Sequence, residues 1–159
     1  GTTDVVYSGK IGGNRVVVRR FFKQKWRTRC EVYMKTLPGL VLIHKDKAPS
    51  ETSIVVDNPL VNRLVHIECD DREAIYDLFQ EMAFVDAVLP LVHGKPDSKV
   101  TEKGIFLEWD ASIDGPGHIM DPLKVMMGML KKVRRERLDE LNDEQESSQN
   151  RRGRLETKT

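Results

Sequence analysis

The residues with the clearest chemical potential are seven basic side chains between positions 11 and 30. They are Arg15, Arg19, Arg20, Lys23, Lys25, Arg27 and Arg29, and no acidic residue interrupts them. Arginine can bind phosphate oxygens through two parallel hydrogen bonds, so an arginine-rich run suits a phosphate-bearing partner. The pattern therefore predicts that this stretch binds an anionic surface.

Two adjacent aromatic residues, Phe21 and Phe22, lie within the basic run and close to Trp26. Successive side chains of a strand point to opposite faces, so the two rings cannot both face one core. An exposed Phe among Arg and Lys suits a membrane interface, where charges meet headgroups and a ring meets the acyl boundary. The same composition can stack a nucleic-acid base, or it can be a solvated basic strand with one Phe packed beneath it.

The rest of the sequence does not predict catalysis or a bound metal. It contains no G-x-S-x-G motif, no P-loop and no G-x-G-x-x-G motif. Of the four histidines, only His66 has a potential ligand nearby, Cys69, and one such pair falls short of a zinc site. Two cysteines, Cys30 and Cys69, are too few for a disulfide scaffold and predict reduced thiols in a cytoplasmic protein. We therefore expect a non-catalytic protein without a cofactor.

Charge is distributed unevenly along a chain whose net charge is only +1. Residues 51–120 contain 14 acids and 5 bases, a net charge of −9. This asymmetry indicates a basic face for an anionic partner on an otherwise acidic domain. The low total charge makes nucleic acid the least expected of the anionic partners. No apolar run reaches the roughly 18 residues that a membrane-spanning helix needs, so any membrane contact should be peripheral.

Seven short segments have the alternation, the β-branched content and the flanking turn residues of strands. They are Val5–Ile11, Arg15–Phe22, Arg27–Met34, Leu40–His44, Ser53–Val56, Leu64–Ile67 and Gly104–Trp109. In the third segment, Cys30 and Val32 fall on an apolar face, while Arg27 and Arg29 fall on a polar one.

Two helices are predicted as well. In the segment Asp71–Leu89, apolar residues recur at helical spacing, and Pro90 marks its end. A longer helix, Asp121–Leu141, begins with Asp as a natural N-cap and has Pro122 at its first helical position. Its apolar face is rich in methionine, which is typical either of a core or of an adaptable docking surface.

These elements predict one mainly β domain with helices, of the α+β class, over residues 4–142. The helix at 71–89 would be inserted before the last strand, and the long helix would follow that strand. Residues 143–159, which include Arg151, Arg152 and Arg154, are polar and lack periodicity, so they are predicted to form a disordered tail.

The order of elements over residues 4–142 resembles that of pleckstrin-homology (PH) domains. Val6–Gly13 resembles the first PH strand with its Lys-x-Gly-Gly turn, and Lys25–Tyr33 resembles the second strand, where the family often has Trp-Lys-x-Arg. The resemblance implies a seven-stranded antiparallel barrel or sandwich closed by the C-terminal helix. The extra helix at 71–89 makes the chain a divergent version of that plan.

The resemblance also implies a position for the phosphate site, which in this family lies between the first two strands and their loop. Carried over by position, the site would comprise Lys10, Lys25, Arg27 and Arg29, with Arg15, Arg19, Arg20 and Lys23 from the loop. Phe21 and Phe22, from the argument on exposed rings above, would be the membrane contacts. We therefore predict a cytoplasmic module recruited to phosphoinositides, phosphatidic acid or other anionic membrane phospholipids. The alternative is a PH-like protein-interaction or scaffold domain that does not bind lipid and uses its acidic half or its Met-rich helix.

Overall fold

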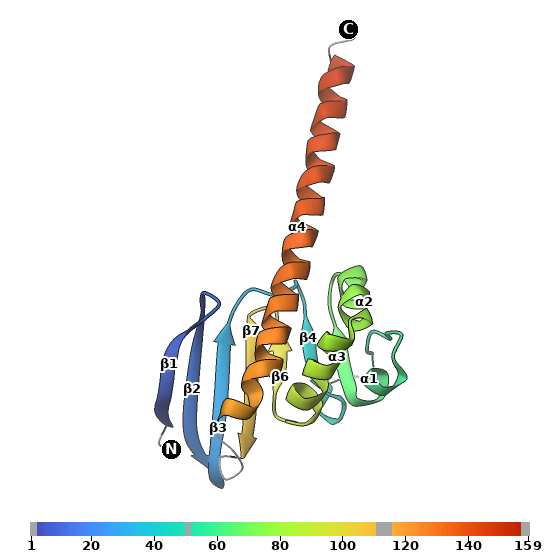
Figure 1. Cartoon of the computed structure of the whole chain (residues 1–159). Helices are drawn as coiled ribbons and strands as arrows, with labels where there is room; N and C mark the ends of the chain where they lie inside the picture. The colour runs from blue at the N-terminus through green and yellow to red at the C-terminus, as the bar shows by residue number, and fades with distance from the viewer. Residues whose placement is uncertain (1–2, 50–51, 111–115, 157–159) are drawn as a thin grey trace.

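A single antiparallel sheet organises the protein (Figure 1). The computed structural model describes residues 3–49, 52–110 and 116–156, with only the backbone described for 150–156. In the described chain the sheet has seven strands in the order β1-β2-β3-β7-β6-β4-β5. The strands are β1 (Thr3–Ile11), β2 (Asn14–Lys23), β3 (Lys25–Tyr33), β4 (Val41–His44), β5 (Val65–Glu68), β6 (Lys99–Thr101) and β7 (Gly104–Asp110).

The predicted α+β class, with seven antiparallel strands and a C-terminal helix, is confirmed. The predicted closure into a barrel or sandwich is not observed, because β1 and β5 are the two edges of one open sheet. The long helix α4 (Met120–Glu156) runs across one face of this sheet instead (Figure 1). Since the helices cover the apolar face of the sheet, that face is buried without closure.

Two strand predictions are corrected by the structure. The segment Ser53–Val56 lies along the edge of β5 but is not a strand. The Ile67 amide donates at 2.9 Å to the Ser53 hydroxyl, whereas in a strand ladder it would donate to a backbone carbonyl. The strand β6 falls in a segment for which no strand was predicted. With three residues and one buried side chain, Val100, it is too short to show alternation.

Helical structure also differs from the prediction in detail. The segment predicted as one helix is divided into α2 (Arg72–Gln80) and α3 (Met82–Val88), because Glu81 is extended with ψ of 114°, and a π-helical turn (Leu89–His93) follows. The break turns Phe84 into the core, where its ring meets Phe79 edge-on at 5.2 Å. An additional helix, α1 (Pro59–Leu64), is capped by the preceding residue, Asn58, whose side chain accepts hydrogen bonds from the Leu60 and Val61 amides. Two short 3-10 turns complete the structure, Lys45–Lys47 and Pro116–Ile119.

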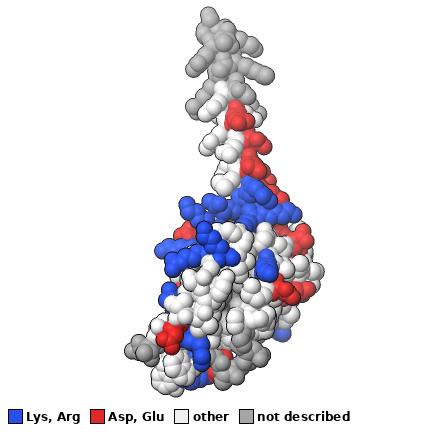
Figure 2. Space-filling view, turned by 60° about the vertical axis from the view of Figure 1, so that its left-hand side comes forward, with Lys and Arg blue, Asp and Glu red and all other residues white. Residues whose placement is uncertain are grey.

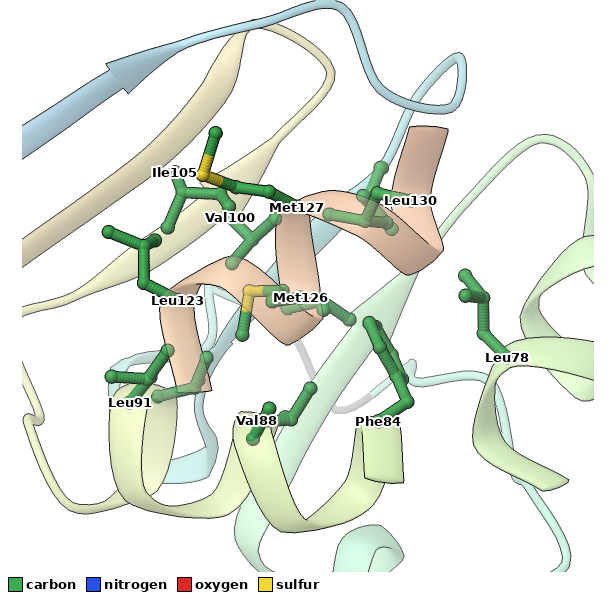
Figure 3. Close-up of a cluster of buried hydrophobic side chains, with 14 of the residues drawn as sticks. Leu78, Phe84, Val88, Leu91, Val100, Ile105, Leu123, Met126, Met127 and Leu130 are labelled. Atoms are coloured by element: carbon green, nitrogen blue, oxygen red, sulfur yellow. The ribbon is translucent and has the colours of Figure 1, made fainter. Parts of the chain in front are cut away.

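The main core lies between the sheet and the helices α3 and α4 (Figure 3). Leu123, Met126, Met127 and Leu130 of α4 are all buried, so the Met-rich face of the helix is core in its first three turns. They pack with side chains such as Phe84 and Ile105, which are fully buried.

The helix α4 stays in contact with the body as far as Arg137, which forms ion pairs with Asp71 and Glu73 next to the start of α2. Beyond Arg137 it continues as a single projecting helix to Glu156 (Figure 1). Residues 143–156, predicted to be disordered, are therefore helical, and the remaining residues 157–159 lie outside the described chain. The packed turns of α4 supply the helix nucleus, and adding residues to an existing helix is far less costly than starting one. The side chains of Arg151, Arg152 and Arg154 lie outside the described part of the structure.

Candidate functional site

The hairpin formed by β2 and β3 carries most of the predicted site and divides it between two faces of the sheet. We call the side covered by α4 the helix face, on which Val18 and Cys30 form a cross-strand pair in the core. The other side is the open face, on which Arg19 pairs with Arg29 across the same two strands. Because side chains alternate along each strand, the basic run cannot form one continuous surface.

On the open face, three predicted headgroup ligands are already neutralised by carboxylates. Arg19 binds Glu31 at 2.7 Å, and Arg29 binds Glu108 at 2.8 Å. Arg27 binds both Asp97 at 2.9 Å and Glu108 at 3.2 Å. Since Glu108 lies on β7, which pairs with β3, the acids come from a distant part of the sequence. These arginines hold the sheet face together and have little free charge for a ligand.

Glu31 is the second organising acid of the open face, and it is buried. It accepts the hydroxyl hydrogen bond of Tyr33, and this bond is the main cause that raises the pKa of Tyr33. On the helix face next to it, burial first and the charge of Glu31 second raise the pKa of the Cys30 thiol to about 12. Cys30 therefore stays a neutral, buried thiol, which is unsuited to nucleophilic chemistry.

A hollow of about 670 Å³ opens on this face, lined by residues that include Arg29, Glu31, Lys99, Phe106 and Glu108. Its acidic and basic side chains are interspersed, and Lys99 lies over the Phe106 ring at 6.0 Å. Such a lining does not present the concentrated positive charge that an anionic headgroup requires.

Removal of Glu108 should reveal its structural role. We expect Glu108→Ala to lower the free energy of unfolding by about 2 kcal/mol, because charged hydrogen bonds to both Arg27 and Arg29 are lost. Urea denaturation followed by circular dichroism measures this change. The control is Asp46→Ala, whose carboxylate is 88% exposed and should contribute almost nothing. Equal effects of the two substitutions would contradict the assignment.

The end of the hairpin where a turn joins β2 to β3 carries four more of the predicted contacts, Arg20, Phe22, Lys23 and Lys25. We call this end the hairpin tip, and it also includes Gln24 and Trp26. Lys23 pairs directly with Lys25, so Gln24 alone makes the turn, with φ of 62°. All six side chains are exposed. In Figure 1 the tip lies at the end of the sheet opposite to the projecting part of α4.

An aromatic pair faces solvent at the hairpin tip. Phe22 is 53% exposed and Trp26 is 41% exposed, and their rings meet edge to face at 5.8 Å. The guanidinium of Arg20 lies over the Trp26 ring at 5.5 Å. Lys25 binds Asp110 at 2.7 Å but remains 58% exposed, and Lys23 forms no ion pair within the described chain. The tip thus combines two exposed rings with three accessible cations.

The other predicted residues do not join the tip. Phe21 points to the open face, where Arg29 lies over its ring at 4.9 Å. Lys10 and Arg15 form a cross-strand pair beside the β1–β2 turn, at the opposite end of the sheet, and Arg15 lies over Tyr33 at 5.5 Å. The structure therefore separates the eight predicted bases into three groups: open face, hairpin tip and β1–β2 end.

Trp26 is the member of the tip that the sequence did not predict as a membrane contact. The alternation of β3 assigns it to the apolar face, together with Cys30 and Val32. It escapes burial because the sheet extends past the covering helices at this end, and its cross-strand partner is Phe22. Its position next to the turn was the available signal, since residues at hairpin ends often lie beyond the core.

Among the described residues, no cluster of His, Cys, Asp and Glu could hold a metal ion. No helix in that same part of the chain has the length and apolarity to cross a bilayer. No family model matches the chain, and neither a curated protein nor a solved structure shows significant similarity to it.

Proposed function

We propose that this domain is a non-catalytic, PH-like membrane-recruitment module that contacts anionic phospholipid through the hairpin tip. The observation that carries the proposal is the exposed Phe22–Trp26 pair with Arg20, Lys23 and Lys25 beside it. Trp at the end of a polar element favours the membrane–water interface, where its ring is buried and its N–H stays wet. Seven antiparallel strands followed by a C-terminal helix support the PH-like plan, while the open sheet departs from it.

The side chains of the tip are better suited to recognising a high density of negative charge on a membrane than the structure of one particular headgroup. Each Lys or Arg near an anionic bilayer contributes about 1 kcal/mol, and the aromatic rings add apolar burial. Three cations and two rings therefore give weak, reversible binding that recruits the protein to the cytoplasmic surface of a membrane rich in anionic lipid. Phosphatidic acid and phosphoinositides, which carry the most charge per headgroup, are the preferred ligands.

Vesicle sedimentation tests the proposal. The wild-type chain should sediment with phosphatidylcholine vesicles only when phosphatidic acid, phosphatidylserine or phosphoinositide is added, and high salt should weaken this binding. Phe22→Ala with Trp26→Ala should reduce the bound fraction at least tenfold. The matched control is Tyr76→Ala with Met82→Ala, which removes two exposed apolar side chains from α2 and α3 and should leave binding unchanged. Undiminished binding by the tip variant would overturn the proposal.

Trp fluorescence gives an independent readout of the same contact. The chain has two Trp residues, and Trp109 is only 4% exposed, so Trp109→Phe leaves Trp26 as the reporter. Its emission should shift to the blue with anionic vesicles and stay unchanged with neutral ones. If emission does not respond and sedimentation fails with every lipid, the alternative of a protein-interaction or scaffold domain without lipid binding is favoured.

A further inference from the structure

The helix α4 carries two segments of opposite charge. Lys131–Arg137 contains five bases and one acid, whereas Asp139–Glu146 contains five acids and no base. Every described side chain from Leu138 to Gln149 is exposed. Figure 2 shows the blue basic side chains at the base of the projecting helix and the red acidic ones directly above them.

Lys131, the first base of that segment, lies near four other bases at the same end of the sheet. We call these five residues the basic collar: Lys10, Arg15, Lys35, Lys103 and Lys131. The amine of Lys131 donates to the Gly12 carbonyl at 2.6 Å, which brings α4 against the β1–β2 turn beside Lys10 and Arg15. The Met34 amide donates to the Lys103 carbonyl at 3.2 Å, which places Lys35 and Lys103 at this end of the sheet. None of the five forms an ion pair within the described residues.

The acidic segment is electrostatically unfavourable as a lone helix. Asp139 and Asp143 stand four residues apart, as do Glu140 and Glu144, and like charges at this spacing repel on a helix surface. Glu140 alone has a basic partner among the described residues, Arg137 at 2.5 Å. The segment cannot fold back onto the collar of its own chain, because the helix is continuous from Met120 to Glu156. Among the described side chains no cation pairs with the other four acids of the segment, and a second molecule can supply such cations.

One exposed stripe of α4 has the charges arranged for pairing with a copy of itself. At 3.6 residues per turn, Lys132, Arg135, Asp139, Asp143 and Glu146 fall within roughly 80° of one another. All five are exposed. Lys132 and Glu146 are placed symmetrically about position 139, and so are Arg135 and Asp143. An antiparallel crossing centred there therefore pairs the two bases with Asp143 and Glu146 of the second helix, and the two copies of Asp139 face each other at the centre.

We infer that the projecting helices of two copies of this chain pair antiparallel about a two-fold axis near Asp139. Lys132 of each copy then meets Glu146 of the other, and Arg135 meets Asp143, which gives four ion pairs from one repeated contact. The partner's acidic segment also passes beside the basic collar. This inference is independent of the proposed membrane contact, which lies at the other end of the sheet.

A flat membrane fits this end of the molecule poorly. The helix beyond Arg137 extends for roughly 28 Å and presents five acids to any surface that approaches the collar. A narrow acidic partner alongside the helix avoids that repulsion, and the acidic segment of a second copy provides it.

Sedimentation velocity of charge-reversed variants tests the inference. The wild-type chain should be dimeric at low salt and shift toward monomer at high salt. Lys132→Glu with Arg135→Glu should weaken association at least tenfold, and so should Asp143→Lys with Glu146→Lys. An equimolar mixture of these two variants should form a heterodimer, since each then supplies the charges that the other needs. Lys23→Glu with Arg63→Glu, which makes the same charge change elsewhere, should leave the dimer intact.

Cross-linking tests the register. In a Cys69→Ser background, Asp139→Cys should form an intermolecular disulfide on mild oxidation, because the two copies of position 139 meet at the axis. Leu141→Cys, on the opposite side of the helix, should not. A monomer at all concentrations, or a dimer that the charge reversals do not affect, would overturn the inference.

Discussion

Gly104→Ala is expected to destabilise the protein by roughly 3–5 kcal/mol, a large fraction of the stability of an ordinary domain. Gly104 has φ of 150°, a conformation that residues with a side chain rarely adopt. A Cβ at this position would lie 1.9 Å from the Val32 carbonyl oxygen and 3.3 Å from the Met34 amide nitrogen. Both contacts are backbone, so no side-chain rotation can relieve them.

The effect of Gly104→Ala should extend to the open face, because Gly104 begins β7 and pairs there with Tyr33 of β3. The same ladder aligns Glu108 with Arg29 four residues further along. A shift of β7 that makes room for the new methyl group would therefore misplace the carboxylate that binds Arg27 and Arg29. The substitution should reduce both the stability and the order of this face.

Urea denaturation monitored by circular dichroism measures the effect, and Gly128→Ala is a matched control. A Cβ at Gly128 would have open space, and the residue lies inside α4. Ala is favoured over Gly in a helix interior by about 0.5–1 kcal/mol, so the control should be slightly more stable than wild type. If the two glycine substitutions change stability in the same direction, the assigned backbone clash at Gly104 is wrong.

Local sequence signals predicted the parts of the fold whose geometry is set by neighbouring residues. Flanking turn residues, β-branched content and alternation predicted β1, β2 and β3. The pair Asp121–Pro122 predicted the long helix, but the helix begins at Met120, so Asp121 is not its N-cap. Helix α1 was not predicted, although Asn58–Pro59 supplies the signal for it, an N-cap followed by Pro at the first helical position. The break at Glu81 was not predicted either, because no Gly or Pro marks it; it accompanies a tertiary contact, the packing of Phe84 against Phe79.

The candidate site shows why a count of charges along the sequence is insufficient. The basic run is free of acids in sequence, yet β7 brings Glu108 against Arg27 and Arg29, which lie about 80 residues earlier. Strand pairing of this kind is nonlocal and leaves no trace in the run itself. The alternation argument for the two aromatic residues was more successful, because it requires only the local strand geometry: Phe22 is exposed and Phe21 lies on the other face.

Stability at high pH should depend strongly on Cys30. Burial and the charge of Glu31 raise the pKa of its thiol from the ordinary value of 9.0 to about 12 in the folded protein. Between these two pH values the unfolded chain loses the thiol proton while the folded chain keeps it. The folded state thus binds more protons in this window, so its stability falls as pH rises. At about 1.4 kcal/mol per pH unit, the total loss from this one group is about 4 kcal/mol.

Comparison with Cys30→Ala separates this effect from the titration of Lys and Tyr, which both chains share. At pH 8 the wild type should be the more stable chain, because the substitution leaves a small cavity in the core next to Val18. The difference should shrink above pH 9 and reverse by about pH 11, where the unfolded wild-type chain gains from ionisation and the variant cannot. Urea denaturation under reducing conditions at each pH gives the two curves. A constant difference between them would mean that the thiol ionises as easily in the folded protein as in the unfolded chain.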